Sequence, residues 1–174
     1  MNPQYQALSN LAYLYLIQGR YSEAAKASEK ALDLDKNDYE AWSGLVTAYQ
    51  WLGLDEKANA ARAQVLVLAE QAARLNPKDA EAQSALAALY ARQGQAEKAR
   101  QRIKTALALG PDNSIVLSSV ADAYELLVDR RHAIEYTRKA LKMGLTTEEL
   151  RVDPDLQAVI KDPRFSLPPA KSER

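Results

Sequence analysis

The side chains that could perform acid–base, nucleophilic or metal chemistry are scattered along this chain rather than grouped into motifs. His132 is its one histidine, it contains no cysteine, and it has no glycine-rich phosphate-binding loop. Aspartates and glutamates are abundant but recur at the spacing of solvent-facing helix positions. Because an enzyme needs a nucleophile, an acid–base pair or a metal cluster with convergent geometry, we expect no catalytic residue, no cofactor and no metal site.

The overall charge limits the classes of partner. Lysine and arginine total 23 residues, and so do aspartate and glutamate, which leaves a net charge of zero. Nucleic-acid binding normally requires a clustered basic surface. No apolar run approaches the roughly 18 to 20 residues of a membrane span, and the N-terminus lacks a signal-peptide pattern. We therefore expect a protein or peptide partner, no nucleic acid, no membrane span and a cytoplasmic location.

The elements that must position any binding residues are repeated. The gaps between Tyr15, Tyr49, Tyr90 and Tyr124 are 34, 41 and 34 residues. The same gaps separate Ala24, Ala58, Ala99 and Ala133, and also Gly19, Gly53, Gly94 and the position of Val128. A later alanine series, Ala31, Ala72, Ala106 and Ala140, has gaps of 41, 34 and 34. The second unit therefore carries seven extra residues, between Ala58 and Ala72.

Each unit has the pattern of two helices. In the third unit, Asp79 is a good N-cap, apolar residues follow at helical spacing, Gly94 separates the helices and Gly110-Pro111 ends the second one. Small alanines at fixed positions allow helices to pack closely. The sequence therefore predicts an all-α fold of four antiparallel helix pairs, at about residues 5–38, 39–79, 80–113 and 114–147.

These residues carry a family resemblance. The second unit, with Trp42, Leu45, Tyr49, Gly53 and Ala58, resembles the tetratricopeptide repeat (TPR). The other units keep the tyrosine and alanine positions, whereas a tryptophan at the position of Trp42 occurs in the second unit alone. The resemblance implies a right-handed superhelical α-solenoid over one domain, residues 1–165, with a disordered tail at 166–174. It also implies a non-catalytic scaffold for protein–protein interaction.

The resemblance further implies that the first helix of each unit lines a concave groove that binds a partner segment. Carried over position by position, the groove residues are Ser9, Asn10, Tyr13, Ile17, Ser43, Thr47, Trp51, Ser84, Arg92, Ser118 and Asp122. Two alternatives stay open: the serines are simply small residues at helix contacts, and Trp51 is buried between repeats. The acidic residues Glu40, Glu81, Asp122 and Glu125 favour a partner with some positive charge, and the alternative is that they are ordinary solvated residues.

The seven-residue insertion is close to two helical turns. It predicts one long helix, about Asp55 to Leu75, that projects beyond its neighbours without a rotation of its packing face. The run Val65-Leu66-Val67-Leu68 is apolar around the whole circumference. Either neighbouring repeats cover it, or Val65, Leu66 and Leu68 form an association surface, for example in a homodimer. The second explanation gives the alternative function, an assembly or oligomerisation module.

The segment after the fourth unit predicts a terminal cap. Thr146 to Glu149 has the S/T-x-x-E capping pattern, and Asp153-Pro154 predicts a further short helix at roughly 154–161. Apolar side chains would then dock on the open end of the stack: Leu156, Val159, Ile160 and Phe165. The segment from Asp153 resembles the closing part of TPR regions in many bacterial proteins. In one version of the alternative function, the assembly module, the chain is the C-terminal regulatory part of a larger bacterial signalling protein.

Overall fold

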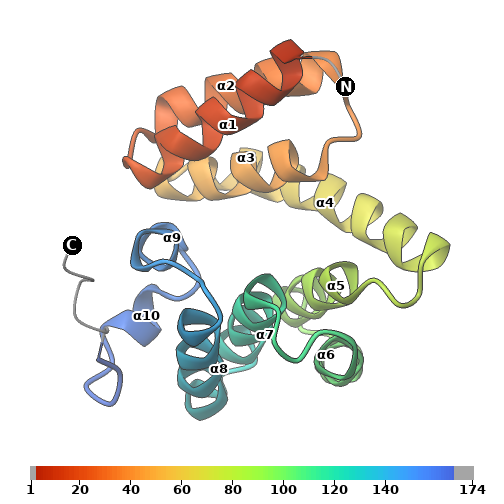
Figure 1. Ribbon diagram of the computed structural model, residues 1–174, viewed down its shortest axis with the longest axis vertical. Coiled ribbons are helices and arrows are strands. Elements are labelled where there is room, and N and C mark those ends of the chain that lie inside the picture. Colours follow the sequence, from red (N-terminus) through yellow and green to blue (C-terminus); the bar gives the residue numbers. More distant parts are fainter. Residues whose placement is uncertain (1–2, 167–174) are drawn as a thin grey trace.

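The computed structural model describes residues 3–166, excluding the side chains of Pro3 and Tyr5. Within them the chain forms antiparallel helix pairs followed by two short helices (Figure 1). The pairs are α1 (Pro3–Ile17) with α2 (Tyr21–Leu34), α3 (Tyr39–Trp51) with α4 (Asp55–Leu75), α5 (Ala80–Arg92) with α6 (Ala96–Leu109), and α7 (Ser114–Leu126) with α8 (Arg130–Lys142). The all-α expectation is confirmed. The predicted tail lies outside the described residues except for Ser166.

In three of the pairs, the first helix begins with a capping side chain. Asp38 accepts from the Glu40 amide at 2.9 Å, Asp79 from the Ala82 amide at 3.0 Å, and Asn113 from the Ile115 amide at 2.9 Å. Each bond satisfies an amide that has no partner inside the helix. Local sequence therefore sets where α3, α5 and α7 begin.

The turn inside each pair requires a left-handed residue. The first three pairs place a glycine there, and Gly94 for example has φ +72°. The fourth pair places Val128 there, with φ 62°. A β-branched residue is strained in this conformation, and the Val128 side chain is 90% exposed. Its packing therefore does not offset the backbone strain.

Val128→Gly should raise the free energy of unfolding by about 1 kcal/mol, because left-handed backbone costs a non-glycine residue roughly 1–2 kcal/mol. For a chain of this size we expect Tm to rise by roughly 2–4 °C in scanning calorimetry. Gly94→Val is the matched control, since its added Cβ meets nothing within 4 Å, and it should lower Tm. An unchanged or lower Tm for Val128→Gly would contradict the strain argument.

Helix α4 belongs to both halves of the molecule. Ala58 and Ala61, near its start, pack with α1, α2 and α3. Ala69 and Ala73, near its end, pack with α5, α6 and α7. These alanines and Val65 recur every three or four residues, so one continuous face serves both halves. The expected bounds of the long helix and its unrotated face are confirmed, but the extension does not project freely.

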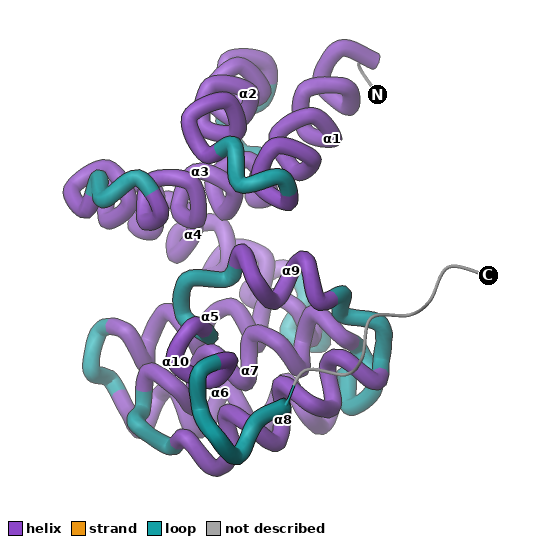
Figure 2. Tube along the Cα trace, turned by 90° about the vertical axis from the view of Figure 1, so that its left-hand side faces the viewer, coloured by secondary structure: helices purple, strands orange, loops and turns teal. Residues whose placement is uncertain are grey.

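The two extra turns separate the halves. Seven residues add roughly 10 Å to a helix, about the diameter of one helix with its side chains. Helix α5 packs against α4 and α7, and the regular stack is interrupted between α3 and α5. In both views α9 (Thr147–Val152) lies in this interval, and it contacts α1 (Figures 1 and 2).

The apolar run of α4 is largely covered by the chain itself. Val65 is buried, Leu66 packs on the core formed with α5 to α7, and Leu68 is half-buried. Val67 is the exposed member of the run, at 54%. Of the two explanations for this run, coverage by neighbouring repeats is the one that the structure supports.

The C-terminal cap differs in detail from its prediction. Thr146 and Glu149 form the expected capping box and begin α9. The further short helix expected at roughly 154–161 is present, but its expected N-cap at Asp153 is wrong, because Asp153 ends α9 and its side chain accepts from the Asp155 amide at 2.9 Å. Helix α10 begins later and spans Gln157–Ile160. The resulting turn carries the chain back toward α8.

The cap docks on the last helix pair, as expected. Leu156, Val159 and Phe165 are buried together with Ile134 of α8. Ile160 packs at the edge of this cluster.

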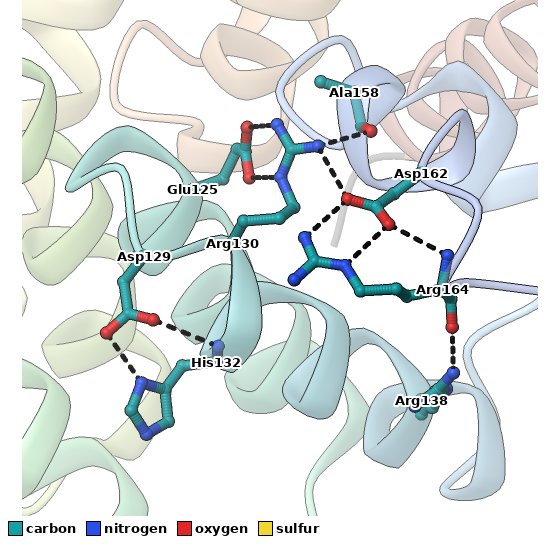
Figure 3. Close-up of polar contacts among 8 residues, drawn as sticks. All are labelled: Glu125, Asp129, Arg130, His132, Arg138, Ala158, Asp162 and Arg164. Atoms are coloured by element: carbon teal, nitrogen blue, oxygen red, sulfur yellow. Dashed lines mark hydrogen bonds and ion pairs between the residues drawn. The ribbon is translucent and has the colours of Figure 1, made fainter.

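Ion pairs surround this apolar contact (Figure 3). Arg130 pairs with Glu125, lies 3.6 Å from a carboxylate oxygen of Asp162, and donates to the Ala158 carbonyl at 2.7 Å. Arg164 bonds the same Asp162 at 2.8 Å and, with other contacts, lowers the pKa of that carboxyl. Residues 157–165 are thereby held to α8 by both apolar and charged contacts.

Candidate partner-binding groove

The interval between the two halves is crossed by residues 146–156, which include α9 and which we call the strap. Its polar atoms meet side chains of the predicted groove. The Tyr13 hydroxyl donates to Glu149 at 2.8 Å, and the Trp51 indole N–H donates to the Val152 carbonyl at 2.7 Å. Arg92 forms an ion pair with Asp155. The groove side chains are the donors in all three contacts, and the strap supplies the acceptors.

Two of these donors are aromatic side chains whose surroundings fix their position or their protonation state. Trp51 stacks on Tyr21 with ring centroids 5.3 Å apart and an angle of 4° between the planes, and the side chain is 36% exposed. Trp51 is therefore not buried between repeats. Burial and the hydrogen bond to Glu149 raise the pKa of Tyr13 to about 12, so its hydroxyl keeps its proton at neutral pH.

A cavity of about 370 Å³ lies beside the strap. Its walls come from α1, α3, α4, α5, α7 and the strap itself. The structure brings six of the predicted groove residues together here: Tyr13, Ile17, Ser43, Thr47, Arg92 and Asp122. Small residues such as Ser43, Ala85 and Ala88 lie in the walls beside longer side chains, and the volume between them can accept part of a further segment.

A second cavity of about 430 Å³ lies between α1 and α3. It is lined by Ser9 and Asn10 and shares Tyr13, Ser43 and Thr47 with the first. The hydroxyl oxygens of Ser9 and Ser28 are buried there without a hydrogen-bond partner in the described part of the chain. The two cavities therefore form neighbouring parts of one groove.

Three predicted groove residues line neither cavity: Trp51, whose indole bonds the strap, Ser84 and Ser118. Ser84 is fully buried, and its hydroxyl donates to the Glu81 carbonyl at 2.9 Å. Ser118 is half-buried and lines neither of the two cavities. Ser84 fits the alternative of a small residue at a helix contact, because close packing leaves it no access to a partner.

Two carboxyl groups meet where the strap crosses α7. One oxygen of Asp122 is buried and has no hydrogen-bond donor while both groups are ionised. Desolvation and the nearby charges of Asp153 and Asp155 raise the pKa of Asp122 well above its usual range, while Arg92 opposes them. Desolvation and Asp155 raise the pKa of Asp153 to about 6. A proton shared by Asp122 and Asp153 satisfies both groups.

This pair makes strap docking dependent on pH. The folded pKa lies above the unfolded value of about 3.9, so the contribution to stability is complete below about pH 4. It is lost as the pH rises through the raised pKa values of the pair, of which that of Asp153 is about 6. Arg92 and Asp155, which face the same pair, act in opposite directions on it.

Asp122→Asn supplies an amide donor that needs no proton. We expect the variant to be more stable than the wild type at pH 8 by on the order of 1 kcal/mol, and to lose most of that advantage at pH 5. Urea unfolding at the two pH values measures this. Asp33→Asn, at an exposed site on α2, should show no such change. Equal differences at both pH values would count against a shared proton.

Two of the four acidic residues assigned to the groove are not free, whereas Glu40 is exposed and lines the second cavity. Glu125 is paired with Arg130, and Asp122 faces Asp153. Asp122 and Glu125 therefore no longer support the expectation of a positively charged partner. The cavity also contains Arg62 of α4 beside Arg92, and burial together with the Arg92 charge lowers the pKa of Arg62.

Sequence reasoning misses Arg62 and the strap. Groove positions are carried over from the first helix of each pair, whereas Arg62 lies on a second helix. The available signal is the insertion itself, because a longer α4 separates the halves and exposes this side chain to the groove.

His132 has a structural role. Its ring nitrogen lies 2.6 Å from Asp129, the residue that caps α8 (Figure 3). Its ring also stacks on that of Tyr124. Among residues 3–166, no three histidine, aspartate or glutamate side chains are grouped so that they could hold a metal ion. None of the helices described here is both long enough and apolar enough to cross a membrane.

Comparison with known proteins places these observations in a family. The model of the tetratricopeptide repeat matches residues 15–66 and 59–123. A solved structure, the thermophilic TPR protein TTC0263 of Thermus thermophilus, is 28% identical over 87% of this chain and 80% of its own, with a TM-score of 0.55. PilF of Pseudomonas aeruginosa shares the fold at 20% identity, over 86% of this chain and 67% of its own, with a TM-score of 0.52. No curated protein matches the chain.

Proposed function

Because the chain belongs to the tetratricopeptide repeat family, we propose that it is a non-catalytic scaffold that binds a segment of a partner protein in its groove. One observation carries this proposal. The Trp51 indole donates to a backbone carbonyl of the strap at 2.7 Å, so the groove already binds polypeptide within its own chain. A main-chain carbonyl is available in any extended partner segment.

The surface that we assign to the partner is the pair of neighbouring cavities. Their walls combine small residues, such as Ser43, with the exposed aromatic side chain of Tyr13. Aromatic anchors beside small residues are typical of sites that bind a peptide by shape and by a few hydrogen bonds. The proposed contact residues in the cavities are Ser9, Asn10, Tyr13, Ile17, Ser43, Thr47, Arg92 and Asp122. Trp51 lines neither cavity and is included because its indole bonds the strap backbone.

Filling the cavity tests this proposal without removing a strap contact. Ala88→Phe on α5 and Thr47→Phe on α3 place a ring in the cavity, and each should lower the captured amount of partner roughly tenfold or more. The measurement is affinity capture from a lysate of the source organism, quantified by mass spectrometry. Ala60→Phe, on the exposed face of α4, is the matched control and should capture normally. Undiminished capture by both cavity variants would exclude the groove as the site.

Self-association through α4 is the second candidate, alone or as part of a larger signalling protein. It has the support of two exposed apolar residues on this helix, Val67 at 54% and Leu75 at 80%. Of the residues first assigned to it, Val65 is buried and Leu66 and Leu68 are partly covered. Val67→Lys should abolish association if this candidate is correct. A wild-type chain that is monomeric by light scattering would eliminate it.

A further inference from the structure

The strap and the groove are chemically complementary. The groove contributes the hydroxyl of Tyr13, the indole N–H of Trp51 and the guanidinium of Arg92, while the strap contributes two carboxylates and one carbonyl. The amide of Gln50 also faces Asp155, at 3.5 Å. Donors on one side therefore select an acidic segment on the other.

The cavity wall contains a second guanidinium, that of Arg62, which forms no ion pair with the strap. Arg62 lines the cavity beside Arg92, and its guanidinium donates to Asn59 of its own helix at 2.7 Å. Among the described residues, no carboxylate forms an ion pair with Arg62. A further carboxylate placed in the cavity would find this partly buried guanidinium within its walls.

The strap is attached unequally to the two halves. Leu150 and Leu156 are fully buried in the cluster with α7 and α8. Toward α1 and α3 the contacts are polar, and Tyr13 is 48% exposed. Polar contacts at exposed positions contribute little net stability. A competing segment can therefore replace the contacts with α1 and α3 while the two leucines stay buried.

We propose that this cleft between the halves binds an acidic segment of a partner protein, and that Glu149 to Asp155 of the strap occupies the same donors in the free chain. The proposal rests on the function proposed above and adds the chemistry of the partner. It also assigns the strap a second role, as an internal competitor. Partner binding then requires that α1 and α3 release the strap.

A labelled peptide with the sequence of residues 146–156 tests this on the full chain by fluorescence anisotropy. Glu149→Gln with Asp155→Asn removes the two competing carboxylates but keeps a glutamine that suits the capping box. This double variant should bind the peptide roughly tenfold more tightly than the wild type. Adding Arg92→Gln should reverse that gain.

Two controls match these changes. Glu148→Gln with Asp112→Asn removes the same charge at exposed sites and should bind like the wild type. Arg100→Gln, exposed on α6, is the control for Arg92→Gln. A peptide whose aspartates and glutamates are replaced by asparagine and glutamine should bind at least tenfold more weakly. Circular dichroism of each variant checks that it is folded.

Four results would overturn the proposal. Equal binding of the acidic and neutral peptides would show a groove that binds peptides without selecting charge, and would leave the proposed function standing. Equal binding by the wild type and the double variant would exclude the strap as a competitor. A wild-type dimer that dissociates in the double variant would show that the strap acts in a second copy instead. Loss of all peptide binding together with undiminished capture by the cavity variants would reject the proposed function as well.

Discussion

The length of α4 controls how the two halves of the molecule meet. One face of this helix packs with α1 to α3 near its start and with α5 to α7 near its end. The two additional turns move these contacts apart by roughly the diameter of a helix. An interval this wide would expose apolar helix faces to water, which costs free energy. The strap therefore lies in this interval. The cavity beside the strap is the part that remains unfilled.

The strap is attached by two kinds of contact with different strengths. A fully buried leucine, such as Leu150 or Leu156, contributes about 1.5–3 kcal/mol through the burial of its side chain. A hydrogen bond at a partly exposed site, such as that of Trp51, contributes about 0.5–1.5 kcal/mol. The strap is therefore a fixed part of the C-terminal half and a weaker partner of the N-terminal half. This inequality makes the cleft between the halves the natural place for a binding partner.

The groove has a different character from the one that a position-by-position comparison with the family implies. Ser84 is buried in helix packing, and Glu125 is paired with Arg130. Arg62 enters the groove from a second helix because α4 is long. The resulting surface combines small residues and the Tyr13 hydroxyl with two arginines and the carboxyl groups of α7 and the strap. Its chemistry depends on the insertion as much as on the repeat.

The sequence by itself determines the helices of this protein. The bounds of α4, the caps at Asp79 and Asn113 and the docking of Leu156 all follow from local spacing or from a regular repeat. Only the tertiary structure decides that Trp51 is exposed and that the strap crosses the groove. These features depend on the distance between two halves far apart in the chain. Helical period and capping act within a few residues, so they set each helix without specifying which distant segment fills the space between them.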